Sequence, residues 1–424
     1  MRVLLISANT EQINILPLPL GLNCVAMAVR NAGHEVRLLD LMVERDYHSS
    51  VREVVLEFSP DIVGISVRNI DDQEIEGTRF LLDPVKRVVR ECRDATEAPI
   101  VLGGAGYSIF PEAALEYLEA DMGIQGEGEA AFPLLLDRIE RKESLAGTPG
   151  LHVRGLGLMG PRMFADNLDA LPLPDAALSA LSAPDHKECW MPMQSRRGCP
   201  MDCSYCSTAT IEGRAVRRRS PESFLRGIAA HVEAGFRHFY FVDNTFNLPR
   251  ADAREICTRL IESRLGISWR CIFYPGSVDP ELIRLMAGAG CTEVSLGFES
   301  GCESILKRLN KKFGPDDVRR SSDLLRDAGI RRMGFLLLGG PGETRETVEK
   351  SLSFVDSLNL DSLKITVGIR IYPHTSLARD AVREGLLLPG DNLFRPRFYL
   401  VPELREWLPN TVKCWMADRS NRVS

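Results

Sequence analysis

The chain has 424 residues, of which 44% are hydrophobic and 26% charged, a balance typical of a soluble globular protein with room for two or three domains. Its formal net charge of −6 argues against a general nucleic-acid binder, which needs surplus lysine and arginine to hold phosphates. The N-terminal apolar run MRVLLIS is too short for a signal peptide or a membrane span, and no later run is long enough. We therefore expect a cytoplasmic protein without a membrane span.

Residues 1–142 alternate short apolar runs with amphipathic stretches. The predicted strands are Val3–Ile6, Val36–Leu39, Ile62–Val67, Ile100–Leu102 and Met122–Ile124, and the predicted helices are Gly21–Asn31, Ser50–Phe58, Thr78–Glu91, Pro111–Glu119 and Glu129–Arg138. Such alternation predicts parallel strands joined by right-handed crossovers, in an α/β doubly wound (Rossmann-like) sheet. Gly33 follows the first helix and is expected at a positive φ as its C-cap. Ligands of such sheets bind at the carboxyl ends of the strands.

Two further regions follow, and a change in composition separates them. Residues 143–188 are rich in Gly and Pro with weak periodicity, which predicts a linker, with a hairpin around Leu151–Met163. Residues 189–385 repeat a helix, a glycine stop and a strand, which predicts a partial β/α (TIM-like) barrel with functional loops after its strands. Residues 386–424 are expected to form a C-terminal extension. The signals for the repeated units are helix starts at Ser220-Pro221 and Asp279-Pro280, and stops at Gly235, Gly290 and Gly329.

Three of the eleven cysteines are clustered, in the stretch RRGCPMDCSYC at residues 196–206. Cys199, Cys203 and Cys206 have the spacing C-x3-C-x2-C, whereas the other eight are scattered and are expected to be small buried hydrophobes. Zinc fits this cluster poorly, because a structural zinc takes four protein ligands and no histidine lies nearby. Three thiolates on a [4Fe–4S] cluster would leave one iron open for a substrate or cosubstrate.

The cysteine motif, with Tyr205 before its third cysteine, resembles that of the radical S-adenosylmethionine (SAM) superfamily. The resemblance extends to four later stretches: FVDNTF (241–246), GFESG (297–301), LNKKF (309–313) and FLLLGGPGET (335–344). It implies a [4Fe–4S] cluster on Cys199, Cys203 and Cys206, whose open iron holds SAM and whose electron cleaves SAM to a 5′-deoxyadenosyl radical. The SAM-binding positions that it implies are Tyr205, Asp243, Asn244, Glu299, Ser300, Gly339 and Gly340.

The first domain and the linker stretch NLDALPLPD (167–175) resemble the cobalamin-binding class of this superfamily, the class B methyltransferases and anaerobic cyclases. The matching stretches are PLPLGL (17–22), GISVRN (64–69), LGGAGYSIFPE (102–112) and GIQGEGEAAFPLL (123–135). The implied cobalamin contacts are Leu18, Arg68, Asn69, Gly103, Gly104, Ser108, Gly126, Glu127 and Gly128. The D-x-H-x-x-G motif of many cobalamin proteins does not occur here. The resemblance implies that Arg68 or Asn69 lies beneath the cobalt without a histidine ligand; the alternative is that the domain has kept the fold and lost the cofactor.

Three functions are compatible with this resemblance. The first is a cobalamin-dependent methyltransferase acting on an unactivated carbon of a small-molecule or lipid-like substrate, with flavodoxin or ferredoxin as electron donor and no nucleic acid as partner. The second keeps both cofactors but performs a cyclisation, ring contraction or other rearrangement without methyl transfer. The third is a non-catalytic iron–sulfur protein. The basic run RAVRRR (214–219) is either a solvated face or a grip for an anionic substrate or a reductase. No catalytic side chain, substrate identity or oligomeric state is predicted.

Overall fold

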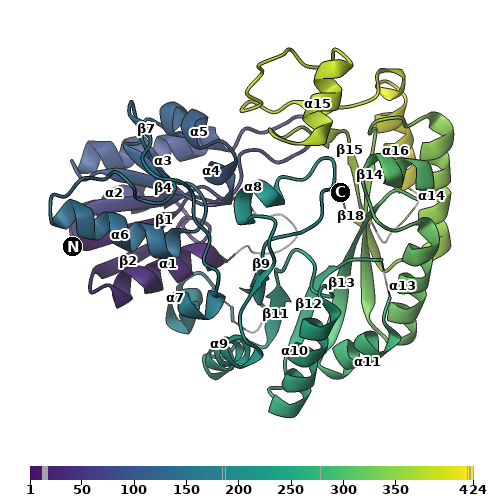
Figure 1. Cartoon of the computed structure of the whole chain (residues 1–424), viewed down its shortest axis with the longest axis horizontal. Coiled ribbons are helices and arrows are strands. Elements are labelled where there is room, and N and C mark those ends of the chain that lie inside the picture. The colour runs from purple at the N-terminus through teal and green to yellow at the C-terminus, as the bar shows by residue number, and fades with distance from the viewer. Residues whose placement is uncertain are drawn as a thin grey trace. The chain divides into compact units, whose positions relative to one another are not determined.

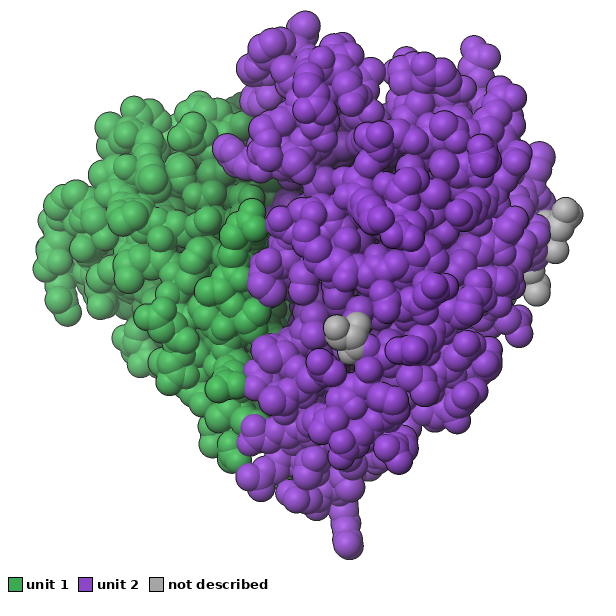
Figure 2. Space-filling model, turned by 45° about the vertical axis from the view of Figure 1, so that its right-hand side comes forward, with its two compact units in different colours: residues 1–72, 79–198, 208–238 green, residues 73–78, 199–207, 239–424 purple. Residues whose placement is uncertain are grey.

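The computed structural model describes residues 1–11, 18–183, 185–186, 188–276, 278–417 and 419, and the backbone of 422–423. The chain divides into two compact units, which Figure 2 shows in different colours. The first unit contains residues 1–72, 79–198 and 208–238, and the second contains 73–78, 199–207 and 239–424. These limits differ from the predicted domain boundaries at 142/143, 188/189 and 385/386, which remain a prediction.

The first unit contains the doubly wound sheet that the sequence predicts (Figure 1). Its parallel strands occur in the order β2 (Glu35–Asp40), β1 (Arg2–Ser7), β3 (Ile62–Ser66), β4 (Ile100–Gly103), β5 (Met122–Ile124). The predicted hairpin is present as β6 (Leu151–Val153) and β7 (Gly157–Leu158). It pairs antiparallel with β5, so this part of the predicted linker belongs to the sheet. The pairing covers the backbone edge that β5 would otherwise leave exposed.

Five helices of this unit correspond to predicted ones: α1 (Leu20–Asn31), α2 (Tyr47–Phe58), α3 (Leu82–Ala95), α5 (Pro111–Leu118) and α6 (Gly128–Glu140). Gly33 has φ 88°, as expected for the C-cap of α1. Helix α3 begins four residues later than predicted, at Leu82. Thr78 instead belongs to the separate segment 73–78, where its hydroxyl donates to the Glu74 carbonyl. The sequence did not predict α4 (Ala105–Ile109), a single turn too short to show periodicity. Apolar side chains of α1 and α6 pack on β1 and β5 to form the core.

The remaining elements of the first unit lie before and after the clustered cysteines in the sequence. They comprise the short helices α7 (Ala176–Leu181) and α8 (Thr208–Glu212), the strand β8 (Trp190–Met193), the antiparallel ribbon of β9 (Arg196–Arg197) and β10 (Arg217–Arg218), and α9 (Pro221–Glu233). The predicted start of α9 is confirmed, because the Ser220 hydroxyl accepts a hydrogen bond from the Ser223 N–H, with Pro221 at the first helical position.

The second unit contains the strands of the predicted partial barrel, in the order β18 (Arg422–Val423), β15 (Ser362–Val367), β14 (Arg331–Leu338), β13 (Cys291–Glu299), β12 (Ser268–Phe273) and β11 (His238–Phe241). The pairs from β12 to β18 are parallel, as a β/α barrel requires. Its helices are α10 (Arg250–Ser263), α11 (Pro280–Gly288), α12 (Glu303–Arg308), α13 (Pro315–Asp327), α14 (Arg345–Leu358), α15 (Ser376–Arg383) and α16 (Leu408–Ala417).

The helix signals read from the sequence of the second unit are confirmed. The Asp279 carboxylate accepts hydrogen bonds from the first turn of α11, and Gly290 and Gly329 have φ of 90° and 74°. Side chains of β12, β13 and β14 alternate between buried and half-buried, so one face of these strands is covered and the other is more open. Across the described parts of both units, no helix is long and apolar enough to cross a membrane.

Candidate functional site

The three clustered cysteines lie on one loop of the second unit, residues 199–207, which we call the cysteine loop. A turn joins two of them, because the Cys206 N–H donates to the Cys203 carbonyl at 3.2 Å. Burial raises the pKa of the Cys203 thiol; nearby Lys311 lowers it and Cys206 raises it further. As placed, no three His, Cys, Asp or Glu side chains among the described residues form a metal-binding group. The donors themselves, three thiols on one short loop, are the type that iron–sulfur clusters take.

The stretch LNKKF anchors the cysteine loop. The Ser204 N–H donates to the Leu309 carbonyl at 3.1 Å, and the Asn310 side-chain amide donates to the Asp202 carbonyl at 3.0 Å. On its other side, the Ser204 carbonyl accepts from the Leu377 N–H in the first turn of α15 at 2.9 Å. Backbone bonds from two distant segments therefore determine the shape of the loop.

Tyr205, Glu299 and Lys311 form a buried polar triad in the second unit. The Tyr205 hydroxyl donates to Glu299 Oε1 at 2.9 Å, and Lys311 Nζ contacts the Tyr205 hydroxyl at 3.0 Å and Glu299 Oε1 at 3.2 Å. The Lys311 and Glu299 side chains are only 7% and 13% exposed. Burial alone lowers the pKa of Lys311, but the Glu299 carboxylate outweighs it and holds the pKa above its ordinary value. The triad therefore places a stable charge pair beside the cysteine loop.

Glu299 has a backbone conformation that glutamate rarely adopts, with φ 66° at the end of β13. Residues in such conformations cluster at functional sites, where the surrounding structure holds them. Sequence reasoning singled out Tyr205 and Glu299 but gave Lys311 no role, although the residue lies within the LNKKF stretch. The burial of Lys311 is visible only in the structure, because a lysine in a polar stretch is expected to be exposed.

Three other predicted SAM-binding residues follow strands of the same unit. Asp243 and Asn244 come directly after β11, where Asp243 is fully buried and Asn244 is half-buried. The Ser300 side chain is also fully buried; its hydroxyl contacts the Ser351 hydroxyl at 3.0 Å and accepts from the Cys302 N–H at 3.1 Å. The Ser300 hydroxyl therefore stabilises the turn after β13.

The structure gives a packing reason for glycine at both positions of the predicted pair after β14. A Cβ on Gly339 would lie 2.4 Å from the Leu400 side chain, and one on Gly340 would lie 2.9 Å from the Ile369 side chain. Their N–H groups donate to the Glu343 carboxylate. Packing within the chain therefore gives these glycines a structural reason of its own. The close backbone approach to a nucleoside stays a prediction.

Glu343 is 3% exposed, and among the described residues its Oε1 atom has no hydrogen-bond partner. Burial raises the pKa of this carboxyl from 4.5 to about 7, although the two glycine N–H groups oppose the shift. A carboxyl whose pKa is raised on folding stabilises the fold most fully below its unfolded pKa, and that contribution is lost as the pH rises through its folded pKa. Through Glu343, the free energy of unfolding should therefore fall as the pH rises from about 4.5 to about 7.

We expect Glu343→Gln to remove this pH dependence, because glutamine stays neutral. Relative to wild type, the variant should gain stability as the pH rises from about 5 to about 8, measured by urea unfolding of the cofactor-free protein. The control is Glu346→Gln, an exposed position in the first turn of α14. Parallel stability curves for wild type and Glu343→Gln would show that Glu343 does not titrate in this range.

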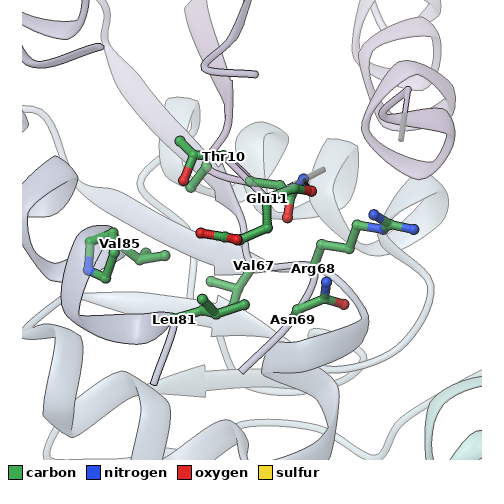
Figure 3. A pocket seen from close by; sticks show the side chains of 10 residues that line it. Thr10, Glu11, Val67, Arg68, Asn69, Leu81 and Val85 are labelled. Carbon is green, nitrogen blue, oxygen red and sulfur yellow. Dashed lines mark hydrogen bonds between the residues drawn. The ribbon is translucent and has the colours of Figure 1, made fainter. Parts of the chain in front are cut away.

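In the first unit, the loops after β1 and β3 border a small, open hollow. It is lined by residues 8–11, by 67–69 and by the start of α3, and so lies at the carboxyl edge of the sheet. Figure 3 shows the predicted Arg68 and Asn69 on one side of the hollow and Val85 on the other. Sequence reasoning missed Asn9, Thr10 and Glu11; the adjacency of β1 and β3 brings these residues to the same edge.

The other predicted cobalamin contacts lie on loops that meet at this edge. The Ser108 hydroxyl donates to the Gly104 carbonyl at 2.9 Å and accepts from the Gly126 N–H at 3.0 Å, which joins the loops after β4 and β5. Gly104 has φ 99°, and a Cβ there would lie 2.5 Å from the Val67 carbonyl oxygen. A Cβ on Gly103 would meet open space. Leu18 is buried, while residue 17 of the PLPLGL stretch lies outside the described residues.

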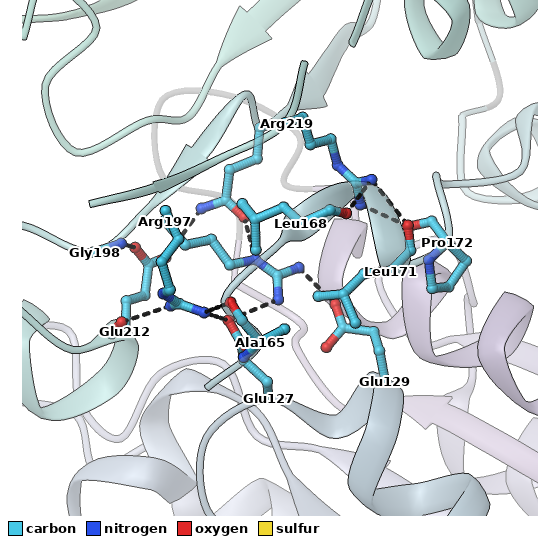
Figure 4. A network of polar contacts seen from close by, with 12 residues as sticks. Glu127, Glu129, Ala165, Leu168, Leu171, Pro172, Arg197, Gly198, Glu212 and Arg219 are labelled. Carbon is cyan, nitrogen blue, oxygen red and sulfur yellow. Dashed lines mark hydrogen bonds and ion pairs between the residues drawn. The ribbon is translucent and has the colours of Figure 1, made fainter. Parts of the chain in front are cut away.

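Glu127, predicted as a cobalamin contact, has its carboxylate occupied within the chain (Figure 4). Its Oε1 atom lies 2.5 Å from an Arg217 nitrogen, and its Oε2 atom accepts from the Ala165 N–H at 2.8 Å. Arg217 and Arg219 are buried, whereas Arg214 and Arg218 of the same run are exposed. The buried Arg217 and Arg219 are neither part of a solvated face nor available to grip an anionic partner. Residues of an extended strand alternate between two faces, so only part of the basic run is exposed.

Two family matches cover most of the chain. Residues 8–136 match the B12 binding domain, and residues 193–355 match the radical SAM superfamily. An uncharacterised methyltransferase of Pyrococcus horikoshii is 28% identical over 92% of this chain and 84% of its own. The cytidylyl-2-hydroxyethylphosphonate methyltransferase of Streptomyces wedmorensis is 26% identical over 89% of this chain and 80% of its own.

A solved structure shows the same fold. The radical SAM methyltransferase TsrM of Kitasatospora setae, with tryptophan substrate and a SAM analogue bound, superposes with a TM-score of 0.88 at 22% identity, over 99% of this chain and 90% of that one. The B12 match begins directly after β1 and runs through β2, β3, β4 and β5 into α6, with the loops around the hollow. The radical SAM match spans the cysteine loop and the triad. The chain thus combines a B12 binding domain with a radical SAM domain, as the cobalamin-binding class of radical SAM enzymes does, and the cofactors of these domains are a [4Fe–4S] cluster, SAM and cobalamin.

Proposed function

We propose that the enzyme methylates an unactivated carbon of a small-molecule substrate. The observation that carries the proposal is that one chain combines a radical SAM region with a B12 binding region. Two relatives named methyltransferases match this chain over most of their own length. A radical generator and a methyl carrier are both needed to methylate a carbon that has no acidic proton. A non-catalytic iron–sulfur protein would need neither SAM nor cobalamin.

In this proposal Cys199, Cys203 and Cys206 hold the cluster. When bound, the cluster supplies the electron that cleaves the SAM sulfonium. The Glu299–Lys311 pair offers one negative and one positive group, 3.2 Å apart and shielded from water, which complements the zwitterionic amino-acid part of SAM. Glu299 would accept from the ammonium, and Asp243 and Asn244, at the end of β11, would face the remaining polar groups.

The hollow at the carboxyl edge of the first sheet is the proposed place of cobalamin, which supplies the methyl group when bound. Ligands of doubly wound sheets lie at this edge, and Gly103 borders open space there, which leaves room for a flat macrocycle. Arg68 is exposed and Asn69 half-exposed at the end of β3, and one of them would lie beneath the cobalt in place of a histidine. We also propose that the enzyme is cytoplasmic and reduced by flavodoxin or ferredoxin.

The test is anaerobic reconstitution with iron, sulfide and hydroxocobalamin, followed by metal analysis and ultraviolet–visible spectroscopy. About four irons and about one cobalt per chain are expected after desalting. The reduced enzyme is then given SAM labelled in its methyl group together with a small-molecule extract. Label in a product, with both 5′-deoxyadenosine and S-adenosylhomocysteine formed, supports methyl transfer. 5′-Deoxyadenosine without transferred label supports rearrangement instead, and failure to retain cobalt overturns the cobalamin assignment.

A further inference from the structure

A buried ionic network lies in the first unit, immediately before the cysteine loop (Figure 4). Arg197, two residues before Cys199, is 12% exposed in its side chain and contacts Glu129 at 2.5 Å and Glu127 at 3.2 Å. Glu127 also contacts Arg217 at 2.5 Å. We call these four residues, Arg197, Arg217, Glu127 and Glu129, the arginine clamp.

The clamp is balanced in charge, with two guanidinium groups and two carboxylates. Arg197 and Arg217 are directly paired across the β9–β10 ribbon. Burial alone raises the pKa of Glu129, but Arg197 outweighs it and holds the pKa below its ordinary value, so the carboxylate is charged. Buried ion pairs contribute little net stability compared with apolar packing, but removing one partner is costly. Such a network therefore tolerates one arrangement of its members and disfavours others.

Gly198, which lies between Arg197 and Cys199, is also fixed in its conformation. Gly198 has φ 89°, and a Cβ there would lie 2.0 Å from the Ala215 carbonyl oxygen. Its N–H donates to Glu212 at 2.9 Å, and the other oxygen of that carboxylate accepts from the Gln194 side chain at 3.0 Å. Gln194 in turn accepts from Arg197 at 3.0 Å. The two residues that lead into Cys199 thus have almost no conformational freedom.

The carboxylates of the clamp come from the cobalamin-binding region. Glu127 and Glu129 flank the first residue of α6, in the loop that follows β5 at the carboxyl edge of the first sheet. The clamp therefore connects this loop to the arm of chain that enters the cysteine loop. Nothing in the proposed chemistry requires these charges to touch SAM, cobalamin or substrate.

We propose that Arg197 is a positioning residue, and that the arginine clamp holds the arm before Cys199 against the loop after β5 so that Cys199 is in place to ligate the cluster. This inference rests on the proposed role of Cys199 as a cluster ligand. Its predicted consequence is that the cluster becomes labile when the clamp is broken, even in protein that is folded.

Arg197→Gln tests the clamp, and Arg219→Gln is the matched control. Arg219 is also buried and lies in the basic run 214–219, but among the described residues its guanidinium donates to carbonyl oxygens, at 2.7 Å to Leu168, 2.9 Å to Leu171 and 2.8 Å to Pro172. Both variants should unfold at lower urea concentration as cofactor-free proteins. After anaerobic reconstitution, Arg197→Gln should release iron to a chelator roughly tenfold faster than wild type and show an altered electron paramagnetic resonance spectrum, and Arg219→Gln should do neither.

The double variant Arg197→Gln, Glu129→Gln separates positioning from stability. Removing both partners relieves the unpaired carboxylate, so the urea midpoint should recover toward wild type while iron release stays fast. The proposal is overturned if Arg197→Gln keeps the iron release and spectrum of wild type, or if the double variant recovers both properties together. Arg197→Lys, which keeps the charge but not the fork that spans two carboxylates, gives the same readout should Arg197→Gln not fold. Unchanged iron in Cys199→Ala would instead show that the ligand assignment has failed.

Discussion

A Cys203→Ala protein, reconstituted anaerobically, is expected to hold almost no iron and to form no 5′-deoxyadenosine from SAM. The cysteine loop offers three thiols, and a cuboidal cluster with one open iron needs all of them. Cys203 is chosen because its thiol is partly buried and Lys311 lies close enough to lower its pKa. Iron and sulfide analysis measures the first effect, and mass spectrometry of the quenched reaction measures the second.

Two further cysteine variants serve as controls. Cys414→Ala removes an exposed thiol on α16, and Cys302→Ala removes a buried thiol that contacts the Ser304 hydroxyl. Both should keep the iron content of wild type. If Cys203→Ala also keeps full iron, the cluster does not reside on this loop and the whole assignment of the site is wrong.

Lys311→Met is expected to destabilise the cofactor-free protein by about 3–5 kcal/mol and to abolish SAM binding. Methionine fills a similar volume but leaves the Glu299 carboxylate and the Tyr205 hydroxyl buried without their cation. The buried Glu299 carboxylate then has no cation beside it, and the site loses one of the two charged groups that would hold the amino-acid part of SAM. Urea unfolding measures the stability, and equilibrium dialysis of reconstituted protein with labelled SAM measures the binding.

The adjacent lysine provides the matched control. Lys312 is 58% exposed, and its ammonium lies 3.8 Å from the Asp202 carboxylate. Exposed pairs of this kind contribute at most about 1 kcal/mol, so Lys312→Met should bind SAM normally and lose little stability. Should the two variants behave alike in both assays, the buried triad has no part in holding SAM.

Elements with a strong local signal were predicted well from the sequence. Strand β5 has the predicted limits, Met122–Ile124, because an apolar run buried on both faces stands out from its polar flanks. The helix starts at Ser220 and Asp279 were identifiable because a capping side chain and the following proline are neighbours in sequence. The hairpin was found, but its membership of the sheet was not, because pairing with β5 depends on which edge the sheet leaves open.

The site was predictable only where a motif is contiguous. The cysteines stand out by spacing, whereas Arg197 and Glu129 are 68 residues apart and each reads alone as a surface charge. The glycine pair after β14 was recognised, but the side chain that a Cβ on Gly339 would meet belongs to Leu400, far along the chain. Local sequence thus reveals which residue types are present, and only the tertiary structure reveals which of them neutralise one another.

The chain passes between its two compact units at five points, around residues 72, 78, 198, 207 and 238. During synthesis the first unit is therefore incomplete until residue 238 has left the ribosome, and by then the cysteine loop has already been made. A gene cut at any single position cannot yield two self-sufficient proteins, because one fragment always carries pieces of both units. The two compact units, unlike the two regions that match known families, are therefore not separable by a single cut in the chain.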